Sequence, residues 1–203
     1  PVAPPVFLQA IADQHKKALE IKSNIPVIVC LGNPPYGRHE AITDENKAHT
    51  GGWVRWGDDD EGRQIIPVPD GAPRNLPAIL HDFIDPATNA GYGVHVKNLY
   101  NLYIYFWRWA LWKVFEHETS QSPGIVSFIT ASSFLDGDAF CGMREHMRRD
   151  CDEIWILDLG GEGRGTRQDD NIFDIQTPVT IAIAVRSENY NPDIPAKTHY
   201  KRI

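Results

Sequence analysis

The stretch from Val27 to Gly37 reads V-I-V-C-L-G-N-P-P-Y-G and predicts a strand that ends in a rigid turn. Its first five residues are apolar and mostly β-branched, which is the pattern of a buried parallel strand. Pro34 and Pro35 must end that strand, because neither has a backbone N–H to donate to a neighbouring strand. Asn33 and Tyr36 are therefore expected at the carboxyl end of a strand, where open α/β sheets bind ligands.

The residue types of this turn suit the binding of an amino group. The side-chain carbonyl of Asn33 is a hydrogen-bond acceptor, and the backbone carbonyl of Pro34 is left outside the sheet. Two converging acceptors can hold an exocyclic –NH₂ group and leave its lone pair facing an activated methyl group. Tyr36 offers a flat ring on which a nucleobase or a planar amide can stack. A solvent-exposed Pro-Pro turn without a ligand is the alternative interpretation.

The residues Asn33, Pro34, Pro35 and Tyr36 resemble motif IV of amino-group methyltransferases that use S-adenosylmethionine. In such families the Asn side chain and the carbonyl of the first proline hold the target amino group, and the Tyr stacks on the target. The resemblance thus implies a catalytic role for all four residues and S-adenosylmethionine as the cofactor.

Composition and length limit the number of domains and the kinds of site that the chain can contain. A chain of 203 residues can bury a core, and one domain is the default at this length. Cys30, Cys141 and Cys151 form no C-x-x-C pair and have no histidine at metal spacing, so we expect free thiols and no metal site. No segment is apolar enough to cross a membrane, and the start lacks Met and a signal peptide. We therefore expect a cytoplasmic piece of a longer protein.

The formal net charge of −7 neither excludes nor strongly supports binding to nucleic acid. Contacts with a phosphate backbone need a basic face. Much of the acid is local, as at Asp58–Glu61, and basic residues cluster elsewhere, as at Arg144, Arg148 and Arg149. A larger parent protein can carry the main DNA-binding surface.

The order of the predicted elements is that of an α/β domain with a mostly parallel sheet and flanking helices. Residues 6–22 predict a leading helix, 25–37 the strand and the catalytic turn, and 38–97 a Gly- and Pro-rich insertion that is too long for an ordinary connection. Residues 98–186 form the remaining half. In it we expect helices and strands alternating over residues 98–116, 124–130, 138–149, 153–159 and 177–186. No helix precedes the final strand, so we expect it to pair antiparallel.

Further blocks carry a closer resemblance: Asn98–Tyr103 (N-L-Y-N-L-Y), Thr130–Gly137 (T-A-S-S-F-L-D-G) and Asn171–Gln176 (N-I-F-D-I-Q). With the Pro-Pro turn, they look like the adenine-N6 DNA methyltransferase part of single-chain restriction–modification enzymes, which also carry helicase, nuclease and target-recognition parts. The resemblance covers about residues 25–186. It implies a partial Rossmann-like methyltransferase sheet and double-stranded DNA with a flipped-out adenine as the partner.

The same resemblance assigns a role to Phe173. The target adenine must leave the duplex to be methylated, and an aromatic residue at this position packs on the extruded base opposite Tyr36. The other interpretation of Phe173 is a core residue that leads into the last strand.

The cofactor-binding part of the family pattern is missing from the sequence. The only candidate turn, Asp158–Gly165 (D-L-G-G-E-G-R-G), has Glu162 and Arg164 where glycines belong, and a strand follows it instead of a helix. We interpret it as a loop in which Arg164 and Arg167 contact DNA phosphate. The main S-adenosylmethionine-binding motif is therefore expected outside this chain, and the chain alone is expected to be inactive.

Three functions remain open at this point. The first is an adenine-N6 DNA methyltransferase, present here as the second half of its catalytic domain. The second is an amino-methyltransferase that acts on protein glutamine or on RNA, although those enzymes usually run quickly from the turn to the next helix. The third is a non-catalytic module that binds nucleic acid or scaffolds a helicase or nuclease, which the missing cofactor turn favours.

Overall fold

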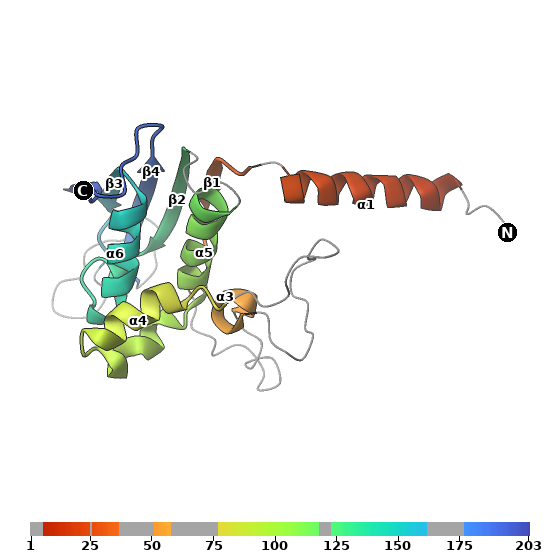
Figure 1. Cartoon of the computed structure of the whole chain (residues 1–203). Coiled ribbons are helices and arrows are strands. Elements are labelled where there is room, and N and C mark those ends of the chain that lie inside the picture. The colour runs from red at the N-terminus through yellow and green to blue at the C-terminus, as the bar shows by residue number, and fades with distance from the viewer. Residues whose placement is uncertain (1–5, 25, 37–50, 58–76, 118–122, 162–176) are drawn as a thin grey trace.

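The computed structural model describes residues 6–24, 26–36, 51–57, 77–117, 123–161 and 177–203 (Figure 1). Its strands are β1 (Val29–Gly32), β2 (Gly124–Ala131), β3 (Glu153–Asp158), β4 (Val179–Arg186) and β5 (Lys197–Arg202). Its α-helices are α1 (Val6–Asn24), α3 (Gly52–Trp56), α4 (His81–Asn89), α5 (Leu102–Leu111) and α6 (Cys141–Asp150). A π-helix continues α5 over Trp112–Glu116, and short 3₁₀ segments cover Gly93–Leu99, Ser132–Phe134 and Asp138–Phe140.

The strands form one mixed sheet in the order β1-β2-β4-β3-β5. β1 pairs parallel with β2, and β3 pairs parallel with β5, whereas β4 lies between β2 and β3 and is antiparallel to both. Every strand except β4 therefore points the same way. This topology confirms the α/β class and the antiparallel strand predicted over residues 177–186. The carboxyl ends of β1, β2 and β3 meet at one edge of the sheet, and the candidate site lies there.

The core fills one face of this sheet. Val126 and Phe128 of β2 and Ala182 of β4 are buried on that face, and α5 packs over them. The ring of Trp107 from α5 meets Phe128 edge-on, with 4.9 Å between the ring centroids. The opposite face is partly exposed over Ile129 and its neighbours, because none of the described helices covers it.

Helix α4 ties part of the predicted insertion to the core. Leu80 and Phe83 are fully buried, and α4 packs closely on α6. A Cβ added at Gly142 of α6 would lie 2.2 Å from the carbonyl oxygen of Phe83. Only a glycine permits that approach, so the spacing of the two helices depends on this one position.

β1 differs from the buried strand that the sequence predicts. It is parallel, as expected, but it lies at the edge of the sheet, and Val29 and Leu31 have 47% and 70% of their surface exposed. An apolar β-branched run specifies that a strand forms, whereas its burial depends on neighbours that are distant in sequence. Four backbone positions from Val29 to Gly32 pair with β2, and the ladder ends before the two prolines as predicted.

The ends of other elements also differ from the predictions. The helix expected over residues 98–116 begins only at Leu102, because Asn101 caps it in an extended conformation. β5 was not predicted from the sequence, because its residues are polar at nearly every position and mostly exposed. The leading helix is present as α1 and extends away from the sheet in Figure 1. All three cysteines are free, as expected, and none of the described helices is long and apolar enough to cross a membrane.

Candidate active site

The Asn-Pro-Pro-Tyr turn follows β1 at the carboxyl edge of the sheet. Asn33 and Pro35 are exposed, Pro34 is buried, and Tyr36 is half-buried against the core. The buried Pro34 ring fixes the middle of the turn, and its backbone φ is already restricted by the pyrrolidine ring. Gly32 precedes the turn, and a Cβ there would lie 3.1 Å from the Phe128 ring. The turn is therefore held on both sides while the Asn33 side chain stays accessible.

Asn33 and Tyr36 contact each other directly. The Tyr36 hydroxyl donates a hydrogen bond of 2.5 Å to Oδ1 of Asn33. Burial raises the pKa of Tyr36 above its usual value, so the hydroxyl keeps its proton at neutral pH and acts as the donor. The amide oxygen has two lone pairs. An incoming amino group can thus add to this bond or replace it.

Asn101, the residue before α5, holds the turn through its side chain. Its Nδ2 donates to the backbone carbonyl of Tyr36 at 3.4 Å, and its Oδ1 accepts from the backbone N–H of Tyr103 at 3.4 Å, which caps α5. The Tyr103 hydroxyl lies 2.8 Å from Oγ of Ser133, which follows β2. An Asn before an apolar helical run is a recognisable capping signal, but its second bond to Tyr36 could not be read from the sequence.

The other predicted site residues lie outside the part of the chain that the structure describes. This holds for Phe173, Arg164 and Arg167, whose proposed contacts with the base and with phosphate therefore stay predictions. Of the predicted site residues, the described part of the chain brings together the four residues of the turn. Asn101, which was not predicted as a site residue, contacts them through Tyr36.

The glycine turn after β3 is described only as far as Gly161. Gly160 and Gly161 have φ values of 71° and 101°, a backbone region that favours glycine. Asp158 is buried, and its carboxylate accepts from the backbone N–H of Gly160 at 3.0 Å and from the Tyr200 hydroxyl at 2.6 Å. Asp158 thus braces the turn and a neighbouring strand. The described residues provide no cradle for S-adenosylmethionine, and the cofactor stays a prediction.

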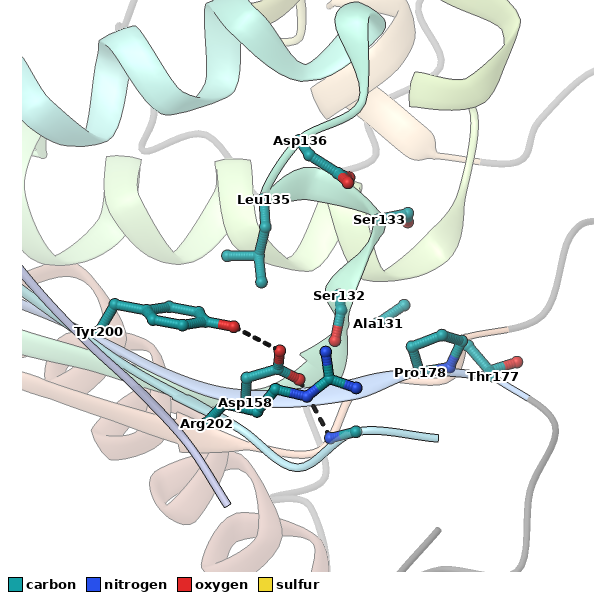
Figure 2. A pocket seen from close by; sticks show the side chains of 11 residues that line it. Ala131, Ser132, Ser133, Leu135, Asp136, Asp158, Thr177, Pro178, Tyr200 and Arg202 are labelled. Carbon is teal, nitrogen blue, oxygen red and sulfur yellow. Dashed lines mark hydrogen bonds between the residues drawn. The ribbon is translucent and has the colours of Figure 1, made fainter. Parts of the chain in front are cut away.

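A cavity of about 370 Å³ opens beside the turn, at the ends of β2, β3 and β5 (Figure 2). Ser132, Ser133 and Asp136 line one side of it, and Asp158 and Tyr200 line the other. None of the four residues of the Asn-Pro-Pro-Tyr turn lines this cavity.

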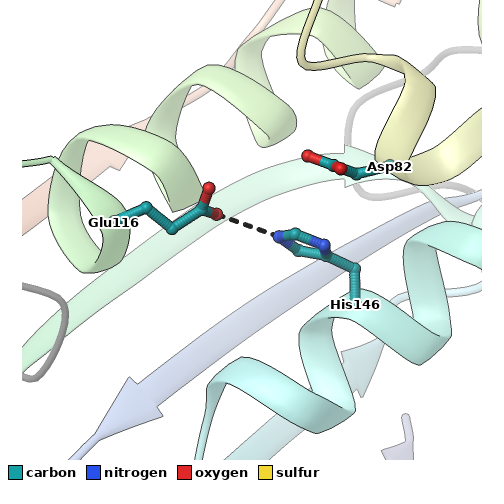
Figure 3. Close-up of side chains that lie close together, drawn as sticks. All are labelled: Asp82, Glu116 and His146. Atoms are coloured by element: carbon teal, nitrogen blue, oxygen red, sulfur yellow. Dashed lines mark hydrogen bonds and ion pairs between the residues drawn. The ribbon is translucent and has the colours of Figure 1, made fainter.

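A charged cluster lies elsewhere, where α4, the π-helix and α6 meet (Figure 3). Asp82, Glu116 and His146 each offer one ligand atom, and these atoms lie within 4.8 Å of one another, which is a geometry that a metal ion could use. The buried guanidinium of Arg108 is already there: its Nη2 lies 2.6 Å from Asp82 Oδ2 and 2.6 Å from Glu116 Oε2. Because this cation pairs with both carboxylates, we interpret the cluster as a structural ion network.

Hydrogen bonds decide the charge of Glu116. Burial alone would raise the pKa of this carboxyl group, but hydrogen bonds from His146 and Arg108 outweigh burial and lower the pKa to about 2. Glu116 is therefore ionised throughout the neutral range, and it links three helical segments through ionic hydrogen bonds.

No protein-family model and no curated protein matches the sequence. Solved structures do. The chain is similar to the ATP-dependent Type ISP restriction-modification enzyme LlaBIII bound to DNA, at 26% identity and a TM-score of 0.63 over 94% of this chain and 11% of that one. It is also similar to DrdV in a complex with DNA, at 26% identity and a TM-score of 0.56 over 95% of this chain and 16% of that one.

A third match shows the shared fold alone. It is a nuclease-deletion mutant of the Type ISP restriction-modification enzyme LlaGI with a DNA substrate mimic, at 18% identity and a TM-score of 0.63, over 94% of this chain and 16% of that one. The chain thus spans only about a tenth to a sixth of the length of these proteins. The matches relate it to one segment of large restriction–modification enzymes.

Proposed function

We propose that this chain is the target-base half of an adenine-N6 DNA methyltransferase within a larger restriction–modification polypeptide. The observation that carries the proposal is the rigid turn at the carboxyl edge of the sheet, where the exposed Asn33 amide and the Tyr36 ring lie together. The similarity to DNA-bound restriction–modification enzymes over nearly the whole chain supports it.

The chemistry follows from the acceptors of the turn. The exocyclic amine of adenine has two hydrogens, and Asn33 Oδ1 and the Pro34 carbonyl can accept one each. Holding both hydrogens fixes the orientation of the nitrogen and directs its lone pair away from the turn, which is the positional contribution expected of a site that prepares a nucleophile. A competing base with a carbonyl in place of the amine would place an acceptor oxygen against two other acceptors and be rejected.

Without substrate, the Tyr36 hydroxyl occupies the position expected for the amine of the base. It donates to one lone pair of the Asn33 amide oxygen until the base arrives. When adenine binds, its amine takes the same acceptor, and the Tyr36 ring provides stacking that partly offsets the stacking lost on flipping. The acceptor thus exchanges one donor for another when the base binds.

S-adenosylmethionine, held by another part of the polypeptide, would supply the methyl group. The described residues of this chain bind and orient the amine, and the proton lost from nitrogen leaves to solvent because no side-chain base stands among the four residues of the turn.

Methyl transfer from labelled S-adenosylmethionine to DNA by the full-length polypeptide tests the proposal. Asn33→Ala should lower the rate by roughly a hundredfold or more, as removal of one oriented hydrogen-bonding group does in other enzymes. Asn189→Ala, at an exposed asparagine far from the turn, is the matched control and should retain the full rate. Methylation that survives Asn33→Ala unchanged would overturn the proposal and favour the non-catalytic module. Transfer to RNA or to a protein glutamine, but not to DNA, would replace it with the second alternative.

A further inference from the structure

The cavity at the ends of β2, β3 and β5 lies on the same edge of the sheet as the candidate active site and shares none of the four residues of the turn. Its volume of about 370 Å³ lies in the range of small-molecule pockets and exceeds what a single ion or water needs. It opens at the carboxyl ends of β2 and β3, which is the edge of the sheet where α/β proteins bind ligands.

Tyr200 forms a fixed flat wall of this cavity. Its ring is exposed over 58% of the residue surface, yet its hydroxyl donates a 2.6 Å hydrogen bond to the buried carboxylate of Asp158. The other oxygen of that carboxylate is engaged by the Gly160 backbone. An exposed aromatic ring that is anchored at its far end is preorganised for stacking, because little side-chain freedom is lost when a planar ligand binds. Figure 2 shows Leu135 facing it from across the cavity.

The polar groups of the cavity match a nucleotide. Arg202 lies two residues after Tyr200 on β5, so both side chains project from the same face of the strand and both line the cavity. This pairing of an aromatic ring with a nearby cation is the arrangement with which proteins hold single-stranded nucleic acid. Opposite them, Asp136 presents an exposed carboxylate, which only accepts hydrogen bonds and favours a base with an exocyclic amine.

We propose that this cavity binds a second, unpaired nucleotide of the DNA, with its base stacked on Tyr200, its amine at Asp136 and its phosphate near Arg202. The inference rests on the proposed function for its source of unpaired DNA. A nucleotide near the flipped adenine that has lost its own partner would be held by this site.

The distance between the two sites fits this assignment. The turn follows β1, whereas the lining of the cavity runs from the end of β2 to Tyr200 and Arg202 on β5, one to four strands away, which corresponds to roughly 5 to 20 Å. The two are linked by the contacts from Tyr36 to Asn101 and from Tyr103 to Ser133, which lines the cavity. Nucleotides a few positions apart on one strand can therefore reach both sites.

The test uses the 203-residue chain. Titration with dAMP, dCMP, dTMP and inorganic phosphate, followed by amide chemical shifts in nuclear magnetic resonance spectra, should shift the signals of Ser133, Gly160 and Arg202. Binding of dAMP and dCMP should be several-fold tighter than binding of dTMP, and Asp136→Asn should remove that difference. Tyr200→Ala should weaken dAMP binding at least fivefold, as the loss of one stacking ring does elsewhere.

Trp155→Ala is the matched control. Trp155 is also exposed on the sheet, but it stacks on His199 on the face opposite Tyr200, so its loss should leave dAMP binding unchanged. Three results would overturn the inference: equal dAMP affinity in Tyr200→Ala, shifts that avoid the cavity, or inorganic phosphate binding as tightly as dAMP. If Tyr200→Ala does not fold, Asp136→Asn and the comparison of dAMP with dTMP still decide it.

Failure of this inference and failure of the proposed function can be told apart. Asn33 does not line the cavity, so Asn33→Ala should keep nucleotide binding by the chain while it abolishes methyl transfer by the full-length polypeptide. Methylation that depends on Asn33 without nucleotide binding in the cavity would overturn the cavity alone. If nucleotides bind in the cavity and methylation does not depend on Asn33, only the proposed catalytic role would be overturned.

Discussion

Asn101 donates a hydrogen bond from Nδ2 to the backbone carbonyl of Tyr36, although 65 positions separate them in the sequence. The same side chain caps α5 through Oδ1. One residue thus fixes both the start of the central helix and the position of the candidate catalytic turn.

Substitution at Asn101 can separate these two roles. Asn101→Asp keeps an oxygen that can cap the helix but removes the donor to Tyr36, so we expect near-normal stability and slower methyl transfer by the full-length polypeptide. Asn101→Ala removes both bonds and should also lower the free energy of unfolding by about 1 kcal/mol. Urea denaturation and methyl-transfer rates measure the two effects. Equal rates in Asn101→Asp and the unmodified enzyme would show that the contact with Tyr36 does not position the turn.

The hydrogen bond from Tyr36 to Asn33 leads to a second prediction. If the ring stacks on the base and the hydroxyl only occupies the resting acceptor, Tyr36→Phe should keep the methyl-transfer rate within about tenfold. Tyr36→Ala should lose much more, because stacking of a base on an aromatic ring contributes roughly 1–3 kcal/mol. Rates measured at saturating cofactor test this. A Tyr36→Phe variant as inactive as Tyr36→Ala would instead make the hydroxyl a participant in the reaction.

The local parts of the fold and site were predictable, and the contacts between distant segments were not. The strand before Asn33, its end at the two prolines and the antiparallel strand over residues 177–186 follow from residue types and periodicity. The exposure of β1 was missed, because burial of Leu31 is decided by which strands lie beside it. β5 was missed because an edge strand needs no apolar face.

The same division holds for individual side chains. The sequence predicts that Asn33 and Tyr36 lie at a strand end, but it does not predict the hydrogen bond between them. Arg108 lies in an aromatic helical run and gives no sign in the sequence that it is 1% exposed and bound to two carboxylates. Such partners come from α4 and the π-helix, and their approach depends on the packing of the whole helical layer.

Arg108 should be among the most sensitive positions of the fold. Its guanidinium donates to Asp82, Glu116 and the Ile79 carbonyl. Arg108→Met would leave the two carboxylates facing each other without this cation. Removal of one partner from a fully buried ionic network costs about 3–5 kcal/mol, and because Asp82 and Glu116 are partly exposed to water, we expect a loss toward the lower end of that range. Arg108→Lys should recover little, because an ammonium cannot reproduce two forked pairs.

Denaturation by urea, followed by tryptophan fluorescence, measures these losses. Arg148→Met is the control, since Arg148 is exposed on α6 and surface substitutions usually change stability by less than about 0.5 kcal/mol. Equal unfolding midpoints for Arg108→Met and Arg148→Met would contradict a structural role for the cluster.

Acid should destabilise the chain through Glu116. Hydrogen bonds from His146 and Arg108 hold the pKa of this carboxyl group at about 2 in the folded chain despite its burial, against 4.5 for the group in its ordinary state. A lowered folded-state pKa means that the unfolded chain takes up the proton first. The stabilisation is therefore complete above about pH 4.5 and is lost as the pH falls toward 2. At roughly 1.4 kcal/mol per unit of pKa, this amounts to at most about 3.5 kcal/mol. Glu116→Gln should be less stable than the unmodified chain at pH 7 and should lose less stability between pH 4.5 and 2.

Glu145→Gln is the control, because Glu145 lies on the exposed side of α6. It should change stability at pH 7 by less than about 0.5 kcal/mol. Urea denaturation across this pH range measures both, and an acid-induced loss as steep in Glu116→Gln as in the unmodified chain would rule out Glu116 as its source.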